Sequence, residues 1–317
     1  MLGRVANTIY WMNRYLERAE NYARFMDVNY NLSLELPPNE EEQWKPLVII
    51  TGDWPLYESL HEKAEKDKVI HFMAFEEQNP NSIYNCIVNA RENARAVRTE
   101  ITKEVWEQIN ALYYLVKNGS EKKKRSDADL RQFFTEIKNG CQLLYGMYDA
   151  TISRNEGWNF AKLGQFLERA DKTSRVLDAK YHFLLNSPNQ VGSTLDLIQW
   201  AALLKSVSAY DMYRKKYGKL TSSSIAEFLI LDRDFPRSIL NCLIRAEQSI
   251  MTLSGSSSGF SNAAQKQLGA LKAQLEYTDI DDIIIQGIHE YLDGIQQKLN
   301  GISTAIYEAF FAIETDN

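Results

Sequence analysis

Apolar residues recur every three or four positions from Val5 to Tyr30. This spacing is the period of one face of an α-helix, so it predicts a long amphipathic helix near the start of the chain. Aromatic side chains at Trp11, Tyr22 and Phe25 widen the apolar face, and we therefore expect much of this helix to be buried. The residues that set the period are Val5, Ile9, Met12, Leu16, Ala19, Ala23, Met26 and Tyr30.

Helical patterns continue along the chain, because only seven prolines interrupt it and each is expected at a helix start or end. Asn79 and Pro80 have the character of an N-cap and a first-turn proline, for a helix that runs to about Arg98. Thr102 predicts the next start, with a helix to about Lys117. We find no run of alternating polar and apolar residues bounded by hairpin turns. The sequence therefore predicts an all-α fold.

Two segments of the chain occur twice. Residues 14–27 align without gaps on residues 165–178, and six of these fourteen positions are identical. Residues 80–90 align on residues 236–246, and six of these eleven positions are identical. The matches keep their order along the chain, which indicates a tandem duplication rather than a chance likeness of two helices.

The duplication divides the chain into a first helical repeat at 1–153 and a second at 154–317. A helical unit that leaves apolar surface exposed is stabilised by packing against its copy. We therefore expect a helical bundle built from two tandem pseudo-symmetric repeats packed into one globule. The repeated helix of each half is then the natural interface element.

The repeated helix carries a Leu-Glu-Arg-Ala motif at 16–19 and again at 167–170. In each copy the motif glutamate lies on the same side of the helix as the charged residues seven and ten positions later. The motif arginine, which directly follows the glutamate, lies on the adjacent side. These residues are the candidates for a functional site: Glu17, Arg18, Arg24 and Asp27 in the first copy, and Glu168, Arg169, Arg175 and Asp178 in the second.

The repeated charges have two interpretations. Ion pairs between the packed helices would set the register of the two halves, and loss of one partner would strand a buried charge. Alternatively, the arginines line a polar cleft and hold a carboxylate or phosphate through bidentate hydrogen bonds. In that case Glu17 and Glu168 are the candidates for acid-base catalysis.

A second charged cluster lies on the predicted helix that ends near Arg98. Arg91, Arg95 and Arg98 share one face of it, and Glu92 is close by. The second copy of this segment does not keep the arginines. The cluster is either a solvated face or a specific contact for an anion.

Composition narrows the function classes. The net charge of -6 and the pI of about 5.4 argue against a nucleic-acid-binding protein. The chain has no uncharged apolar stretch of about eighteen residues, which is the length that a membrane-spanning helix needs, so no membrane span is expected. The chain opens without the features of a signal peptide, and its three cysteines give no disulfide framework, so a reducing, cytoplasmic setting is expected. The basic run at 122–125 is expected to be a solvated loop.

Metal and thiol chemistry have little support in the sequence. A di-iron bundle needs two Glu-x-x-His motifs, and only Glu58 with His61 forms one, so neither a metal nor a cofactor is expected. Cys86 and Cys242 occupy equivalent positions on apolar helix faces. They are expected to be buried small side chains rather than nucleophiles.

Several segments together resemble one known family. The chain resembles the Alpha-E family of bacterial helical proteins, which is named for its glutamate-arginine motif, and the resemblance covers essentially the whole chain. The segments that carry it are LGRVA at 2–6, YWM at 10–12, RYLERAEN at 14–21, NP at 79–80, ARENAR at 90–95, EVWEQIN at 104–110 and FLERAD at 166–171.

The resemblance implies a context rather than a reaction. Members of the family are typically encoded beside, or fused to, circularly permuted ATP-grasp proteins and transglutaminase-like proteins, which implies ATP-dependent amide or peptide bond formation. The leading expectation is a helical partner or scaffold for an ATP-grasp protein, with a polar cleft lined by Glu17, Arg18, Glu168 and Arg169. The alternatives are a stand-alone enzyme that acts on an anionic or peptide-like substrate, and a purely structural interaction protein.

Overall fold

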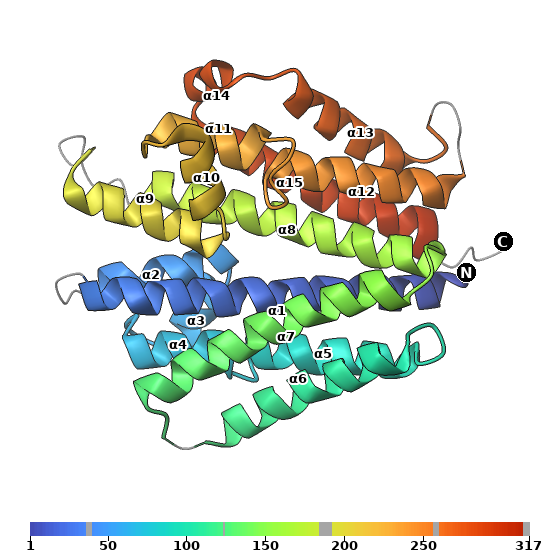
Figure 1. Ribbon diagram of the computed structural model, residues 1–317, viewed down its shortest axis with the longest axis horizontal. Helices are drawn as coiled ribbons and strands as arrows, with labels where there is room; N and C mark the ends of the chain where they lie inside the picture. Colours follow the sequence, from blue (N-terminus) through green and yellow to red (C-terminus); the bar gives the residue numbers. More distant parts are fainter. Residues whose placement is uncertain (36–39, 123, 184–191, 256–259, 313–317) are drawn as a thin grey trace.

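Two long helices, α1 (Gly3–Glu35) and α8 (Glu156–Phe183), lie side by side through the middle of the computed structural model (Figure 1). They run parallel, because the amino group of Met1 meets Glu156 Oε2 at 2.5 Å and Glu17 meets Arg169 further along. The structure describes residues 1–35, 40–122, 124–183, 192–255 and 260–312. Within these ranges every regular element is a helix, so the prediction of an all-α fold is confirmed.

The remaining helices pack on the two sides of this central pair. α5 and α7 pack on α1, and α12 and α15 pack on α8. In Figure 1 the elements up to α7 lie mainly below the pair and those from α10 onward above it. The earlier elements are α2 (Glu40–Thr51), α3 (Trp54–Leu60), α4 (Lys66–Ala74), α5 (Ile83–Ala96), α6 (Lys103–Glu121) and α7 (Asp127–Thr151), of which α2 contacts both central helices. The later elements are α9 (Thr194–Ser206), α10 (Tyr210–Tyr217), α11 (Ser222–Leu231), α12 (Ile239–Ser254), α13 (Ala263–Glu276), α14 (Ile280–Gln286), α15 (Ile288–Ile306) and the π-helical turn η2 (Tyr307–Phe311).

The seam between α1 and α8 is tightly packed. Leu16 on α1 and Leu167 on α8 are both buried. At Gly164 a Cβ atom would lie 2.5 Å from the carbonyl oxygen of Tyr10, which belongs to rigid helical backbone. Only glycine permits this approach, so the position fixes how closely the two helices meet.

The predicted helix boundaries are partly right. Thr102 caps α6 as expected, because its hydroxyl accepts a hydrogen bond from the backbone N–H of Val105. The predicted start at Asn79 and Pro80 is wrong, since Ser82 caps α5. Asn79 instead donates its side-chain amide to the carbonyl oxygen of Phe72 in α4. Pro46 was expected at a helix end but lies inside α2.

The basic run after α6 is less solvated than expected, and Lys123 lies outside the described residues. Lys122 pairs with Asp129. Arg125, however, donates to the carbonyl oxygen of Gly119, and its guanidinium lies 4.0 Å from the centre of the Phe75 ring. Part of this run is therefore packed against the bundle.

Equivalent contacts recur in the two halves of the chain. The Tyr57 hydroxyl donates to the carbonyl oxygen of Lys63 at 2.8 Å, and the Tyr213 hydroxyl donates to the carbonyl oxygen of Lys219 at 2.7 Å. Each tyrosine ring also packs edge-on against a phenylalanine of the following helix, Phe72 in the first half and Phe228 in the second.

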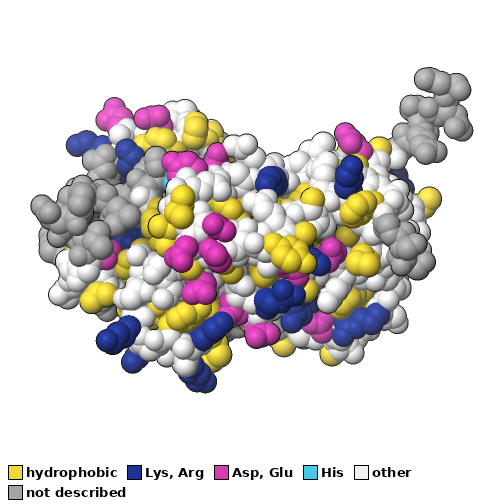
Figure 2. Space-filling model, turned by 90° about the horizontal axis from the view of Figure 1, so that it is seen from above, with side chains coloured by type: hydrophobic (Ala, Val, Ile, Leu, Met, Phe, Trp, Pro, Cys, Tyr) yellow, Lys and Arg dark blue, Asp and Glu magenta, His cyan; other side chains and the backbone are white. Residues whose placement is uncertain are grey.

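Charged and apolar side chains are interspersed over the face that carries α13 and α14, at the top of Figure 1 (Figure 2). No described helix combines the length and the apolar character needed to cross a membrane.

Candidate functional site

The motif glutamate of α1 is buried against the motif arginine of α8. Glu17 is fully inaccessible to solvent. Arg169 donates from Nε to Glu17 Oε1 and from Nη2 to Glu17 Oε2, each at 2.8 Å, in a bidentate contact. Gln165 Nε2 and Asn21 Nδ2 also donate to this carboxylate, at 3.3 Å and 3.1 Å. The carboxylate therefore has donors on both oxygens.

The reciprocal contact joins the motif glutamate of α8 to the motif arginine of α1. Arg18 donates from Nε to Glu168 Oε1 at 2.7 Å and from Nη2 to Oε2 at 3.1 Å. Arg14 Nε donates to Oε2 at 2.8 Å, and Lys172 Nζ lies 3.4 Å from Oε1. Glu168 is also fully buried. Each motif thus uses the other as its partner, which is the cross-helix pairing that the first interpretation of the charges expected.

The cations keep both carboxylates ionised. Burial by itself raises the pKa of Glu17, but Arg169 and Arg237 outweigh it and hold the pKa at about 2. Burial also opposes ionisation of Glu168, yet Arg18, together with other nearby cations, holds its pKa well below the ordinary value. Neither group has the pKa near neutrality that a general acid or base requires.

A second layer of charges extends each motif by one helical turn. On α1, Glu20 pairs with Arg24 and accepts from Arg237 Nη2 at 2.8 Å, and Arg237 Nη1 reaches Glu17 Oε1 at 3.3 Å. On α8, Asp171 accepts from Arg175 Nε at 2.9 Å and from Lys172 Nζ at 2.9 Å. Arg24 and Arg175 therefore belong to the same charged seam as the motifs.

The two candidate aspartates tie the central helices to their outer neighbours instead. Asp27 pairs with Lys138 of α7. Asp178 lies 2.6 Å from Nδ1 of His289 in α15 and accepts from Gln296 Nε2 at 3.3 Å. These residues lie beyond the Glu-Arg contacts and do not meet them.

Arg91 and Arg95 lie away from the motifs. Arg91 donates from Nε to Asn110 Oδ1 at 2.7 Å and lies 4.3 Å from the centre of the Tyr113 ring, so it joins α5 to α6. Arg95 has a largely exposed side chain and pairs with Glu92. The structure does not bring this cluster to the Glu-Arg seam.

Sequence reasoning missed two cations of the seam, Lys172 and Arg237, and the second of them is the more informative. A signal was present, because Arg237 lies in the repeated segment at 236–246, at the position that matches Asn81 in the first copy. Both residues reach a motif: Arg237 binds Glu17, and Asn81 Oδ1 accepts from Arg18 Nη1 at 2.5 Å. The match concealed the role because the two side chains differ in charge.

A polar pocket borders the motif at Arg169. It lies between the end of α7, the first half of α8 and α12, and encloses about 1250 Å3 with its open mouth included. Its lining combines charged and aromatic side chains, among them Asp149, Arg154, Trp158, Lys162, Arg169 and Arg245. Sequence reasoning did not find this pocket.

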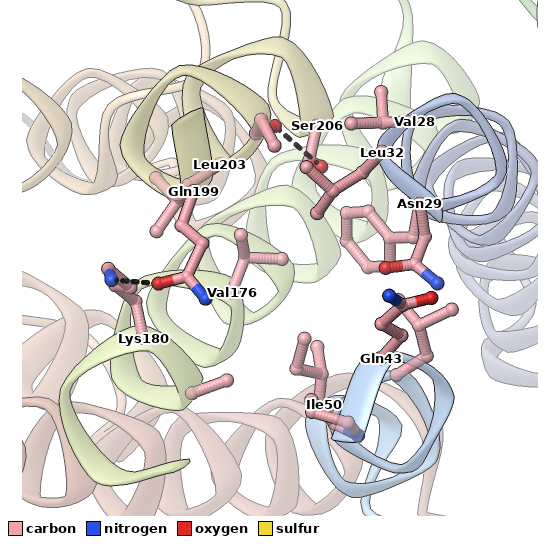
Figure 3. A pocket seen from close by; sticks show the side chains of 15 residues that line it. Val28, Asn29, Leu32, Gln43, Ile50, Val176, Lys180, Gln199, Leu203 and Ser206 are labelled. Carbon is pink, nitrogen blue, oxygen red and sulfur yellow. Dashed lines mark hydrogen bonds between the residues drawn. The ribbon is translucent and has the colours of Figure 1, made fainter. Parts of the chain in front are cut away.

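An apolar pocket lies further along the same two helices, where α2 and α9 cover them (Figure 3). It encloses about 660 Å3 with its mouth, and Val28, Leu32 and Leu203 are among its apolar walls. Lys180 is 1% exposed beside it, and its Nζ donates to Asp196 Oδ1 at 2.8 Å and Gln199 Oε1 at 2.7 Å. The Lys180 amine is therefore engaged rather than directed at a ligand.

The cysteines are buried, as predicted for Cys86 and Cys242. Burial raises the pKa of each of these two thiols to about 12. The thiolate, which is the nucleophilic form, is therefore scarce near neutral pH.

Comparison with known proteins places the chain in one family. Residues 1–311 match the model of the Alpha-E family, described as a predicted alpha-helical domain with a conserved ER motif. Uncharacterized protein Rv2567 of Mycobacterium tuberculosis and Uncharacterized protein Mb2597 of Mycobacterium bovis are each 22% identical to it over 96% of the chain. The match covers 36% of each of these relatives, so the chain spans about a third of their length. No solved structure matches it.

Proposed function

Because the chain belongs to the Alpha-E family, we propose that it is a helical partner or scaffold component of an ATP-grasp-dependent system that forms amide or peptide bonds. Its partners are an ATP-grasp protein and a transglutaminase-like protein, and the ATP chemistry takes place on the ATP-grasp protein.

The observation that carries the scaffold role is the reciprocal use of the two motifs. Glu17 binds Arg169 and Glu168 binds Arg18, with both carboxylates fully buried. Breaking such a pair strands a buried charge, so the pairs hold α1 and α8 in one register. A motif used in this way defines a rigid platform.

The same contacts weigh against the stand-alone enzyme. That alternative requires Glu17 or Glu168 to exchange a proton with a substrate. Both carboxylates are held ionised by surrounding cations, and neither reaches solvent. The scaffold role needs no such exchange.

The length of the relatives supports a role beside other domains. In the mycobacterial relatives, a segment similar to this chain makes up 36% of a longer polypeptide. A helical unit that is joined to a larger remainder in those proteins is suited to act as one component of an assembly here.

We also propose that the scaffold arose by duplication, with repeats at 1–153 and 154–317. The support is the reciprocal Glu-Arg pairing together with the matching contacts of Tyr57 and Tyr213. The proposed boundary falls in the short connection between the end of α7 at Thr151 and the start of α8 at Glu156.

Reconstitution tests the partner role. The tagged chain is used to capture proteins from its native cells at low salt, and the ATP-grasp protein of that organism is then purified and mixed with the chain. We expect a stoichiometric complex by native mass spectrometry, and an ATP turnover by the ATP-grasp protein that rises when the chain is added. A chain that stays alone in both experiments and leaves ATP turnover unchanged would contradict the proposal.

A further inference from the structure

The polar pocket between α7, α8 and α12 has an excess of positive charge. Four cationic side chains line it, namely Arg154, Lys162, Arg169 and Arg245, against the single carboxylate of Asp149. Asp149 accepts from Lys162 Nζ at 2.8 Å and from Arg154 Nη1 at 3.2 Å. One carboxylate is thus shared by two cations. Of the other two, Arg169 pairs with Glu17 behind the lining, and Arg245 has no ion-pair partner among the described residues.

The cations on the floor of the pocket are crowded. Lys162 is 6% exposed. Burial lowers its pKa, and Arg169 and Arg154 act in the same direction, whereas Asp149 opposes them. A bound anion would relieve this mutual repulsion.

Arg169 presents an unused donor to the pocket. Its bidentate contact with Glu17 employs Nε and Nη2, and Nη1 has no hydrogen-bond partner among the described residues. In the reciprocal contact the corresponding atom is taken, because Arg18 Nη1 donates to Asn81 Oδ1 at 2.5 Å. Only the Arg169 copy of the motif therefore has a donor left over at this position.

Two further donor groups of the lining, on Trp158 and Arg245, have no protein acceptor within the described part of the chain. The indole nitrogen of Trp158 is buried and has no hydrogen-bond partner there. Arg245 on α12 donates from Nε to Asn241 Oδ1 at 3.1 Å, and its terminal nitrogens have no partner among the described residues. Arg245 is exposed, so its terminal nitrogens can donate to an anionic oxygen in the pocket, whereas the buried Trp158 nitrogen is closed to it.

We propose that this pocket binds a small molecule through a carboxylate or phosphate group, held by Arg245 and Arg154 at the rim and by Lys162 and Arg169 on the floor. The ring of Phe166, which also lines the pocket, packs against the less polar part of the ligand. Arginine suits this task because its planar donors match both kinds of anion. The site does not depend on the partner role proposed above.

Titration calorimetry with the full chain tests the site. The probes are inorganic phosphate, pyrophosphate and glutarate, each at constant total ionic strength. We expect at least one probe to bind with one-to-one stoichiometry, and Arg245→Gln to weaken binding about tenfold or more, since a charge-assisted hydrogen bond is lost. Arg95→Gln is the matched control, because it removes an exposed arginine outside the pocket and should leave binding unchanged.

A second variant should strengthen binding. Asp149→Asn removes the one carboxylate of the lining and releases Lys162 and Arg154 for the ligand, so affinity should rise several-fold. Binding of the two phosphates alone identifies a phosphate ligand, and binding of glutarate alone identifies a carboxylate ligand. Binding of both kinds supports the shared chemistry. The proposal is overturned if none of the probes binds at millimolar concentration, or if Arg245→Gln and Asp149→Asn both bind like the unaltered chain.

Discussion

Glu17 and Glu168 hold matching positions on α1 and α8, and each is bound side-on by the motif arginine of the opposite helix. Their surroundings differ. Glu168 is contacted by three cations, Arg14, Arg18 and Lys172. Glu17 is contacted by Arg169 and by Arg237, which also binds Glu20.

The motif arginines of the two contacts also differ in how many of their nitrogens have a partner. Arg18 uses its remaining Nη1 on Asn81, whereas Arg169 borders the polar pocket with that atom unpaired within the described chain. Two contacts with one geometry can therefore serve different ends. In the Glu168 contact the motif arginine Arg18 is fully engaged by neighbouring side chains. In the Glu17 contact the motif arginine Arg169 also contributes to the proposed anion-binding pocket.

Removal of the carboxylates should separate the two contacts most clearly. Glu168→Ala strands three cations in the interior, so we expect the free energy of unfolding to fall by about 3–5 kcal/mol. Glu17→Ala should cost less, because Arg237 retains Glu20 and Arg169 can be hydrated from the pocket. Urea unfolding followed by circular dichroism measures both losses.

The matched control for these variants is Glu92→Ala. Glu92 is half-exposed and pairs with Arg95 and Arg91 near the surface, so its removal should change the unfolding free energy by no more than about 1 kcal/mol. A Glu168→Ala variant as stable as Glu92→Ala would show that the buried pairs do not hold the seam.

Acid should weaken the seam in a direction set by the pKa of Glu17. Its pKa is lowered from 4.5 to about 2 in the folded chain. The ionised carboxylate therefore stabilises the fold fully above about pH 4.5, and this stabilisation is lost as the pH falls toward 2.

Comparison with Glu17→Gln isolates this contribution, since glutamine does not titrate. The unaltered chain should be more stable than the variant at pH 6, and the difference should shrink progressively between about pH 5 and pH 2. Urea midpoints at four or five pH values provide the measurement. A difference that stays constant over this range would mean that Glu17 is not held ionised by its partners.

The close approach of α1 to α8 can be tested by a substitution that leaves every charged residue in place. Gly164→Ala places a Cβ atom 2.5 Å from the Tyr10 carbonyl oxygen, so the helices must separate, at a cost of about 1–3 kcal/mol. Gly146→Ala in α7 is the control, because no atom lies within 4 Å of its added Cβ. That control should be neutral or more stable, since alanine favours the helix. Equal stability of the two variants would show that the seam is not tightly packed.

Much of the fold could be predicted from the sequence, because helix periodicity and the repeated motif are local signals. The repeat aligned the motif of Glu17 with the motif of Glu168 and suggested that glutamates and arginines of the two motifs form ion pairs across packed helices. The start of α5 was misplaced because Asn79 and Pro80 mimic a helix start, whereas Asn79 binds the carbonyl oxygen of Phe72 in α4 and Ser82 provides the cap.

The polar pocket could not be predicted in the same way. Arg154 and Lys162 lie close in sequence, but Arg245 comes from α12, and only the packing of α12 on α8 brings them together. No spacing in the chain records that contact. The contribution of Arg237 was hidden for a related reason, since its match in the other copy is the uncharged Asn81.

The smallest expected effect tests the likeness of the two halves outside the seam. Tyr57→Phe and Tyr213→Phe each remove one buried hydroxyl that donates to a backbone carbonyl, of Lys63 and Lys219 respectively. Each loss should lower the free energy of unfolding by about 1 kcal/mol. Tyr213→Phe should cost slightly more, because the Tyr213 hydroxyl also accepts from the backbone N–H of Thr221 at 3.4 Å.

Urea unfolding of the two single variants and the double variant decides the matter. The two sites lie in different halves and share no partner, so the single effects should add in the double variant. Losses that differ by more than about 1 kcal/mol, or that fail to add, would mean that the matching contacts carry different weight. The two proposed repeats would then have the same contact geometry, but the contact would contribute differently to the free energy of unfolding in each.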